Sequence, residues 1–547
     1  MSSGKLLTPD GAGSTLLPPS KLAPTSTFSA LLSTAVGLLF VSLLLYKWRR
    51  RRLEKLAALM PGPPALPLIG NGLEFIGSTE DVMGKIISIS SSYESPFRVW
   101  IGPLLIVVLK NPEDIQIVLN SSKTLGKDPL YRFFRNTVGT GLFSAPVDKW
   151  KKNRRAITPA FNNKLLEQFV PVFNQQNKLL VEKLAPHLNK TEQFDLFDLI
   201  SPATLDIICQ TALGIDVKAQ DNPECEFAQA LYRASELDYM RIYKPWLHTD
   251  FVFYNISYGK ELTKIYKQLH EMPNMVIKKK REEYEKKKET ERLIAEGKIS
   301  EPVEEEQEPQ RLKVFLDILF ELIDSGTNFT NDDLRDEVVT MMVGGSETSA
   351  LTNCFCLLML AMHPEIQDRV YNEIYSIFGD TDREVTMDDL NNLVYLEQVI
   401  KESLRRFPVG PIFLREVKED IDLTSYTLPA GCTVALCPVA MHMREDIYEN
   451  PEKYDPERFT ADNIAKRHKY SFIPFSGGPR GCIGAKYAML SMKTTVSTVL
   501  RSYSVHTTIK MEDIKLKVDL LMRSAIGYPV TLKPRTRKPI PVSTSAN

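Results

Sequence analysis

The sequence predicts a mostly α-helical domain with a small β-sheet, preceded by a single transmembrane helix. Three observations carry this prediction. An uncharged apolar run occupies residues 28–46, residues 97–109 are rich in the β-branched residues typical of strands, and most of the later chain has apolar residues at helical spacing. We therefore expect five parts: a short tail (1–27), a membrane anchor (28–46), a basic and proline-rich hinge (47–70), one large domain (71–535) and a polar C-terminal tail (536–547).

The apolar run from Phe28 to Tyr46 has the length of a membrane span. Its 19 residues would extend about 28 Å as a helix, close to the roughly 30 Å of a bilayer's hydrocarbon core. Six basic residues follow within residues 47–55, and such a cluster marks the cytosolic side. The tail is therefore expected in the lumen and the large domain in the cytosol. A cleaved secretory signal is the alternative, but its apolar stretch is usually shorter and its charges precede it.

Three further segments organise the chain. From Pro61 we expect a stiff, non-helical hinge, because proline fixes φ and disfavours helix in the residue before it. The charge run from Lys278 to Arg292 is expected to be a solvated helix. Residues 296–310, which contain glycine, prolines and an acidic cluster, are expected to form an exposed loop.

The composition argues against a nucleic-acid partner. The 547 residues include 68 basic and 68 acidic side chains, so no global field attracts nucleic acid. The seven cysteines have no CxxC or zinc-type spacing, and their odd number leaves at least one unpaired. This usage is typical of a reducing compartment.

Near the C-terminus, Cys482 lies in a glycine-rich loop, two residues after Arg480. Residues 475–484 read FSGGPRGCIG. Glycines permit backbone angles and close approaches that a Cβ forbids, so this loop can wrap a flat ligand and direct its amides at the sulfur, stabilising a thiolate. A thiolate is an axial ligand of haem iron, and an arginine can pair with a haem propionate. The alternative is a glycine-rich turn around an incidental buried cysteine.

This run resembles the haem-binding signature of the cytochromes P450, Phe-x-x-Gly-x-Arg-x-Cys-x-Gly. All five fixed positions are matched, by Phe475, Gly478, Arg480, Cys482 and Gly484. Because further family motifs follow in order, the resemblance covers the chain from about residue 61 to the end. It implies the cytochrome P450 fold and makes residues 71–535 a haem-thiolate catalytic domain with Cys482 as the metal ligand.

A long helix is expected from Thr330 to the residue before Pro364. Asp333, three residues after Thr330, suits an N-terminal cap, and proline ends the helix. Gly344 and Gly345 interrupt its middle, where each glycine costs on the order of 1 kcal/mol relative to alanine. Such a weak point calls for a packing or functional reason.

In the resembling family, the matching helix segment bulges to leave room for dioxygen. Gly345, Glu347 and Thr348 match that segment, and the acidic residue and the threonine would help deliver protons during oxygen activation. Glycines for helix packing beside a solvated Glu-Thr pair are the alternative.

Within this family the chain resembles the microsomal fatty-acid ω-hydroxylase clan (family 4), insect members included, with which it shares Glu337, Val338 and Thr340. Several members of that clan carry a glutamate esterified to haem at the position of Gly344. Glycine cannot form that ester, so the resemblance implies a non-covalently held haem b.

The remaining motifs are a structural trio and a propionate set. Glu402 and Arg405 are three residues apart and share one helix face, and with Arg458 they resemble the family's buried Glu-Arg-Arg network. Trp150 and Arg154 reproduce the family's Trp-x-x-x-Arg, and Arg415 resembles a further propionate arginine. His442 is a weaker candidate nearby. A solvated basic helix is the alternative for residues 149–155.

These observations favour a membrane-bound haem-thiolate monooxygenase that hydroxylates or epoxidises an apolar small molecule. No nicotinamide or flavin fingerprint is visible in the sequence, so the family implies electrons from NADPH–cytochrome P450 reductase, with cytochrome b5 as a second candidate partner, at the endoplasmic reticulum membrane. A haem-thiolate peroxide isomerase or dehydratase and a non-catalytic membrane lipid binder are the alternatives. The substrate pocket is expected around residues 131–143, 231–253 and 408–414.

Overall fold

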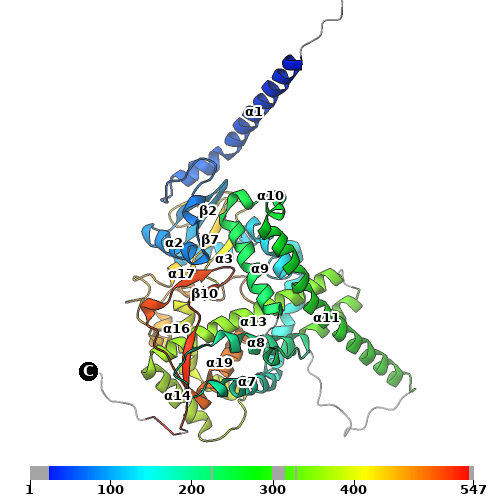
Figure 1. The fold of residues 1–547 in the computed structure, drawn as a ribbon, viewed down its shortest axis with the longest axis vertical. Coiled ribbons are helices and arrows are strands. Elements are labelled where there is room, and N and C mark those ends of the chain that lie inside the picture. The colour runs from blue at the N-terminus through cyan, green and yellow to red at the C-terminus, as the bar shows by residue number, and fades with distance from the viewer. Residues whose placement is uncertain (1–23, 223–225, 299–313, 327–328, 537, 541–547) are drawn as a thin grey trace, which may run out of the picture. The chain divides into compact units, whose positions relative to one another are not determined.

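The computed structural model in Figure 1 describes residues 24–222, 226–298, 314–326, 329–536 and 538–540. The predicted tail up to residue 23, the acidic loop from residue 299 onward and most of residues 537–547 lie outside the described residues. Contacts within the chain divide it into two units, residues 1–55 and residues 56–547. Each unit is described separately.

The first unit consists of most of helix α1 (Pro24–Ala58). Residues 28–58 form a helix that is apolar and extended enough to cross a membrane, and its large apolar side chains are exposed, as with Phe28 and Leu31. The predicted apolar helix is therefore present. It also includes residues 47–58, all of which were predicted to belong to the hinge (47–70), because this Arg, Leu, Lys, Glu and Ala-rich stretch favours helix. The non-helical hinge begins only at the prolines after Met60.

The second unit is built around α13 (Asn331–Met362), which extends about 48 Å. It packs against α8 (Phe197–Ile208), α16 (Val394–Arg406) and α19 (Ala485–Ser502), and Figure 1 shows it crossing the middle of the domain. As predicted, Thr330 and Asp333 form a reciprocal capping box at its start, and His363 caps its end before Pro364. This helix positions the central glycines.

The other helices of six or more residues surround this group. They are α2 (Thr79–Ser92), α3 (Pro112–Asn120), α5 (Val147–Ile157), α6 (Asn163–Gln168), α7 (Val170–Leu184), α9 (Glu226–Tyr243), α10 (Asp250–Asn255), α11 (Ser257–Ala295), α12 (Phe315–Asp324), α14 (Pro364–Phe378) and α15 (Met387–Asn392). The predicted charge run lies on α11 with most of its charged side chains exposed.

The largest sheet has four strands in the order β1-β2-β7-β4. The predicted strand segment forms β1 (Phe97–Ile101) and β2 (Leu104–Leu109), an antiparallel hairpin that turns at Gly102 with φ +57°. β2 pairs in parallel with β7 (Thr433–Leu436), which pairs antiparallel with β4 (Phe413–Glu416).

Three smaller sheets complete the fold, which is mostly helical with little sheet, as predicted. They pair β3 (Phe194–Asp195) and β8 (Tyr503–His506) with β11 (Pro529–Pro534), β5 (Ile421–Asp422) with β6 (Thr427–Leu428), and β9 (Leu516–Val518) with β10 (Met522–Ser524).

Candidate active site

A cavity of about 320 Å³, which we call the main cavity, collects most of the predicted site residues. Its lining includes Trp150 and Arg154 from α5, Gly345 and Thr348 from α13, Arg415 from β4, and Phe475, Arg480, Cys482 and Gly484 from the glycine-rich loop. Glu347, Gly478, Glu402, Arg405 and Arg458 are not among the lining residues. The structure thus brings together residues more than three hundred positions apart in the chain.

The glycine-rich loop is held in one conformation by backbone contacts. The Cys482 N–H donates to the Phe475 carbonyl oxygen over 2.9 Å, and the Gly481 N–H donates to the Gly478 oxygen over 3.0 Å. Gly478 has φ +63°, and a Cβ there would lie 2.1 Å from the Leu119 carbonyl oxygen. Only glycine fits at residue 478, which explains a signature glycine that does not line the cavity.

The Cys482 side chain opens onto the main cavity just before α19 begins. The surrounding protein withdraws the thiol from bulk water, and this burial raises its pKa, while the Gly484 amide and the Arg154 cation oppose the rise. The expected amide stabilisation of the thiolate is therefore present but is outweighed by burial. Coordination to a metal ion would give the further stabilisation that the thiolate needs, because a bound metal deprotonates a coordinating thiol outright.

Three predicted arginines crowd the same cavity. The Arg480 guanidinium lies 4.2 Å over the Trp150 ring and donates to the Leu125 and Ala145 carbonyl oxygens over 3.0 and 2.9 Å. Burial, with Arg415 and Arg154 nearby, lowers the pKa of Arg480 to about 9, and burial also lowers the pKa of Arg415 and Arg154. The Arg480 Nη1 atom is buried without a hydrogen-bond partner among the described residues.

A fourth cation, Lys127, completes this cluster and was missed from the sequence. Its Nζ atom lies 4.4 Å from the Tyr131 ring centre and 4.8 Å from that of Phe143. Burial lowers its pKa well below the usual value, and Arg415 and Arg480 lower it further. A single lysine in a loop between Gly126 and Asp128 carries no sequence signal; only the fold places it beside the arginines.

The four cations define what the cavity accepts. None of Lys127, Arg154, Arg415 and Arg480 forms an ion pair with a carboxylate in the described ranges, although buried cations normally require an anion. A ligand suited to this cavity would carry negative charge toward this cluster, and the Cys482 sulfur could hold a metal ion. Haem b, with two propionates and an iron, fits both requirements.

On the α13 side, the two central glycines differ. A Cβ on Gly344 would meet nothing within 4 Å, so open space lies over this residue. A Cβ on Gly345 would lie 2.5 Å from Cδ1 of Ile208 in α8, so Gly345 permits close helix packing. The packing explanation considered from the sequence fits Gly345, whereas a role of this segment in making room for dioxygen stays a prediction. The Thr348 hydroxyl donates to the Gly344 carbonyl oxygen over 2.7 Å, next to the open space.

Glu347 points away from the main cavity. Its buried carboxylate is ion-paired with Arg523 of β10, whose Nε lies 3.2 Å from Asp519 Oδ2. Desolvation raises the pKa of Asp519 to about 7. Sequence reasoning missed Arg523, because it lies 176 positions from Glu347 and belongs to none of the motifs described above.

Glu402, Arg405 and Arg458 form the expected network outside the cavity. Glu402 and Arg405 are fully buried and share two hydrogen bonds of 2.7 and 2.8 Å, and Arg458 Nε lies 3.7 Å from Glu402. Arg405 also donates to the His442 carbonyl oxygen over 2.9 Å, and His442 Nε2 accepts from the Ile473 N–H over 3.2 Å. His442 thus supports the segment leading to the cysteine loop and does not line the cavity.

Comparison with known proteins decides the family. The family profile described as Cytochrome P450 matches residues 60–528. The chain belongs to the cytochrome P450 family. It is 36% identical over 474 residues to "Cytochrome P450 4V2" of Homo sapiens, covering 86% of this chain and 89% of that one. It is 35% identical over 515 residues to "Cytochrome P450 4c3" of Drosophila melanogaster, covering 93% and 96%.

A solved structure agrees with the fold. The "cytochrome P450DA heme domain" superposes with a TM-score of 0.71 over 87% of this chain and 98% of that one, at 20% identity. The relatives named with family number 4 confirm the predicted clan. This cytochrome P450 is therefore a haem-thiolate monooxygenase, with haem as its cofactor.

The expected pocket segments divide between two regions. Val138, Leu142 and Phe143 from the first segment, and Val409 and Ile412 from the third, line the main cavity. The second segment, residues 231–253, does not reach it; three of its side chains line a separate, smaller cavity.

Proposed function

We propose that this cytochrome P450 hydroxylates or epoxidises an apolar small molecule, such as a fatty acid, a lipid-derived signal, a hormone or a xenobiotic. The supporting observation is the lining of the main cavity: a cluster of cations that includes Arg480 lines it together with many apolar side chains, among them Val138, Leu142, Met341 and Val343. The balanced reaction is RH + O₂ + NADPH + H⁺ → ROH + H₂O + NADP⁺.

The residues have separable roles in this proposal. Cys482 would hold the haem iron, and Trp150, Arg154, Arg415, Arg480 and Lys127 would hold its propionates; the haem, when bound, would supply the redox chemistry. The Thr348 hydroxyl, beside the open space at Gly344, positions a proton for oxygen activation. Glu347 can relay that proton only after its carboxylate separates from Arg523 and takes up a proton from solvent.

We further propose that α1 anchors the enzyme in the endoplasmic reticulum membrane with the catalytic domain in the cytosol. The support is the apolar helix followed by its basic cluster. Electrons would then come from NADPH–cytochrome P450 reductase in the same membrane, with cytochrome b5 as a second donor. The protein should resist alkaline extraction from microsomes, and deletion of residues 1–46 should weaken that association. A glycan on the Asn120 or Asn189 sequon would contradict this topology.

A reconstituted assay tests the reaction. The full chain, with reductase and NADPH, is incubated with a panel of apolar compounds, and products are identified by mass spectrometry. Product that carries one oxygen atom from labelled O₂ supports the proposal. Rapid turnover of a hydroperoxide with no NADPH-dependent product would instead favour a peroxide isomerase.

A further inference from the structure

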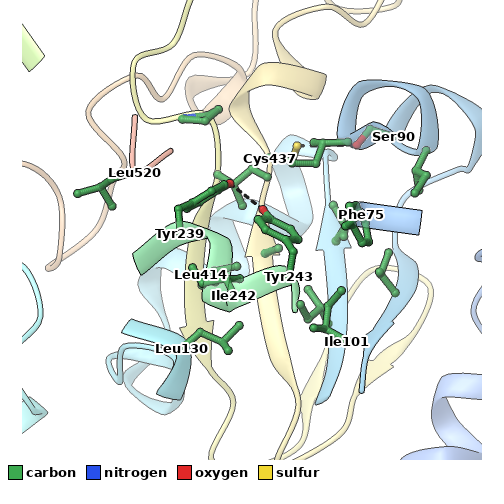
Figure 2. Close-up of a pocket in the computed structure, with 18 of the residues that line it drawn as sticks. Phe75, Ser90, Ile101, Leu130, Tyr239, Ile242, Tyr243, Leu414, Cys437 and Leu520 are labelled. Atoms are coloured by element: carbon green, nitrogen blue, oxygen red, sulfur yellow. Dashed lines mark hydrogen bonds between the residues drawn. The ribbon is translucent and has the colours of Figure 1, made fainter. Parts of the chain in front are cut away.

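A second cavity, of about 110 Å³, lies beside the main cavity; we call it the antechamber (Figure 2). Its walls come from α2, β1, β2 and α9, together with residues near β4 and β7. It shares three lining residues, Tyr131, Ile412 and Leu520, with the main cavity. These side chains are therefore the boundary at which the two cavities meet.

The antechamber carries no charged side chain. Among the described residues that line it there is no Asp, Glu, Lys, Arg or His. A carboxylate moved into such a site would lose its hydration without gaining a counter-ion, which is costly. The four cations line the main cavity and not the antechamber; Lys127 comes nearest, 4.4 Å from the ring centre of Tyr131, which lines both.

The Tyr239 and Tyr243 hydroxyl groups form a hydrogen-bonded pair in the antechamber. Its other polar lining groups are the Tyr131 hydroxyl, which accepts from the Leu414 N–H over 3.4 Å, and the Ser90 hydroxyl, which lies 4.0 Å from the Cys437 sulfur. Tyr239 and Tyr243 are four residues apart on α9, so they lie on the same helix face, and their hydroxyl oxygens are 2.6 Å apart. Figure 2 shows both rings directed into the cavity, joined by this hydrogen bond. Tyr239 is 9% exposed, and Tyr243 packs beside Phe75 with ring centres 5.2 Å apart.

This pair has one hydrogen-bond donor to spare. Two hydroxyls carry two protons, and their mutual bond uses one. Neither hydroxyl has another acceptor within the described ranges. Burial raises the pKa of both tyrosines, so both stay neutral at physiological pH. The spare O–H is therefore a neutral donor suited to a neutral oxygen acceptor.

The size of the antechamber suits one end of a ligand. An apolar cavity of about 150 Å³ is known to hold one benzene molecule, so about 110 Å³ has room for a short group only. A ligand that enters it must continue past Tyr131 and Leu520 toward the haem. In Figure 2, Leu520 lies at one side of the antechamber and Phe75 and Ile101 at the other.

We propose that the antechamber receives the far end of an elongated apolar substrate, and that the Tyr239–Tyr243 pair hydrogen-bonds a neutral oxygen group, an ester, ketone or alcohol, near that end. The enzyme would thus prefer a neutral lipid-like substrate to the free carboxylic acid of the same chain. This inference deepens the proposed function and rests on it.

The test compares palmitate, methyl palmitate and hexadecane as probes. Their binding to the full-length haem-loaded enzyme is measured from the spin-state change in the Soret band at pH 7.4. The ester should bind at least about 10-fold more tightly than the acid, because the acid must be desolvated without a counter-ion. Equal or tighter binding of palmitate would overturn the proposal.

The double variant Tyr239→Phe/Tyr243→Phe removes both hydroxyls and keeps both rings. It should weaken methyl palmitate binding about 3- to 10-fold and leave hexadecane binding unchanged. Each single variant should have a smaller effect, since the remaining hydroxyl can still donate. Tyr258→Phe, at an exposed position on α11, is the matched control. If the double variant weakened the binding of methyl palmitate and hexadecane equally, the proposed hydrogen bond to the ester would be contradicted.

A third variant tests whether the antechamber limits the chain length of the substrate. Ile101→Phe fills the side of the antechamber opposite Leu520 and should shift the preferred ester to a shorter chain; an unchanged preference would contradict occupation of the antechamber. The carbon monoxide spectrum of each variant checks the haem site. Wild-type enzyme without a thiolate spectrum would refute the proposed function, whereas a normal spectrum with no ester preference would refute only this inference.

Discussion

The main cavity and the antechamber meet at three side chains, yet they are built on different principles. The main cavity contains the Cys482 thiol and four cations, and most of these belong to short sequence motifs. The antechamber contains aromatic and aliphatic side chains from several separate elements and has no charge among its described lining residues. The proposed reaction chemistry thus depends on residues that short motifs mark in the sequence, whereas the proposed substrate preference depends on side chains that only the fold brings together.

The largest effect is expected for Cys482→Ser, which removes the one cysteine among the described residues that line the main cavity. The reduced variant with carbon monoxide should lose the red-shifted Soret band of thiolate ligation, and NADPH-dependent turnover should fall to background. Cys437→Ser is the matched control, because Cys437 is a buried cysteine that lines the antechamber. Loss of the band in the control, or its retention in Cys482→Ser, would contradict the assignment.

A large effect is also expected in the network behind the main cavity. Glu402→Gln leaves Arg405 buried without its carboxylate, which costs about 3–5 kcal/mol. We expect low haem incorporation and a lower melting temperature, measured on the purified variant. Glu291→Gln breaks the ion pair of Glu291 and Lys287, which are 65% and 71% exposed. That control should change stability by less than about 1 kcal/mol. A fully loaded, equally stable Glu402→Gln variant would show that the network does not support the haem loop.

The same contrast explains what could be predicted from the sequence. The loop at Cys482 and the helix ending before Pro364 were predictable, because glycine, proline and capping residues constrain the backbone locally. Lys127 and the Arg523 partner of Glu347 were not, because only tertiary folding brings them to their sites. The three expected pocket segments each supply part of the antechamber lining, but its walls from α2, β1 and β2 were not predictable, since apolar side chains from separate elements carry no motif.

A smaller effect, confined to the yield of product per NADPH, is expected when proton delivery is impaired. Thr348→Ala removes the hydroxyl beside Gly344 and should preserve folding, the carbon monoxide spectrum and substrate binding. The yield of product per NADPH should fall at least about 10-fold, with hydrogen peroxide formed instead. Thr352→Ala is the matched control, because Thr352 also lines the main cavity and donates to the Thr348 carbonyl oxygen one turn later.

The coupling of NADPH to product decides the role of Thr348. Full coupling in Thr348→Ala, or an equal loss in Thr352→Ala, would contradict a specific role in proton delivery. Either outcome would also weaken the contrast between the two cavities, because the reaction in the main cavity would then depend less on Thr348 than the sequence motif implies.

The smallest effect concerns the two neighbouring glycines of α13. Gly344→Ala places a methyl group in open space and replaces the poorest non-proline helix former with the best, so it should stabilise the protein by up to about 1 kcal/mol. Gly345→Ala places its methyl group 2.5 Å from Ile208 Cδ1, so α13 and α8 must shift, which costs about 1–3 kcal/mol. Thermal unfolding of the haem-loaded variants measures both changes.

A second substitution separates packing from a direct role in the reaction. Ile208→Ala removes both the Cγ1 and the Cδ1 atoms, each of which would lie 2.5 Å from the new methyl group of Gly345→Ala, so it should restore much of the stability lost in Gly345→Ala while lowering that of wild type. If the double variant regains stability and also coupling of NADPH to product, Gly345 acts through helix packing alone. If stability returns but coupling does not, Gly345 also shapes the space beside Thr348, and the functional interpretation of this glycine holds together with the packing one.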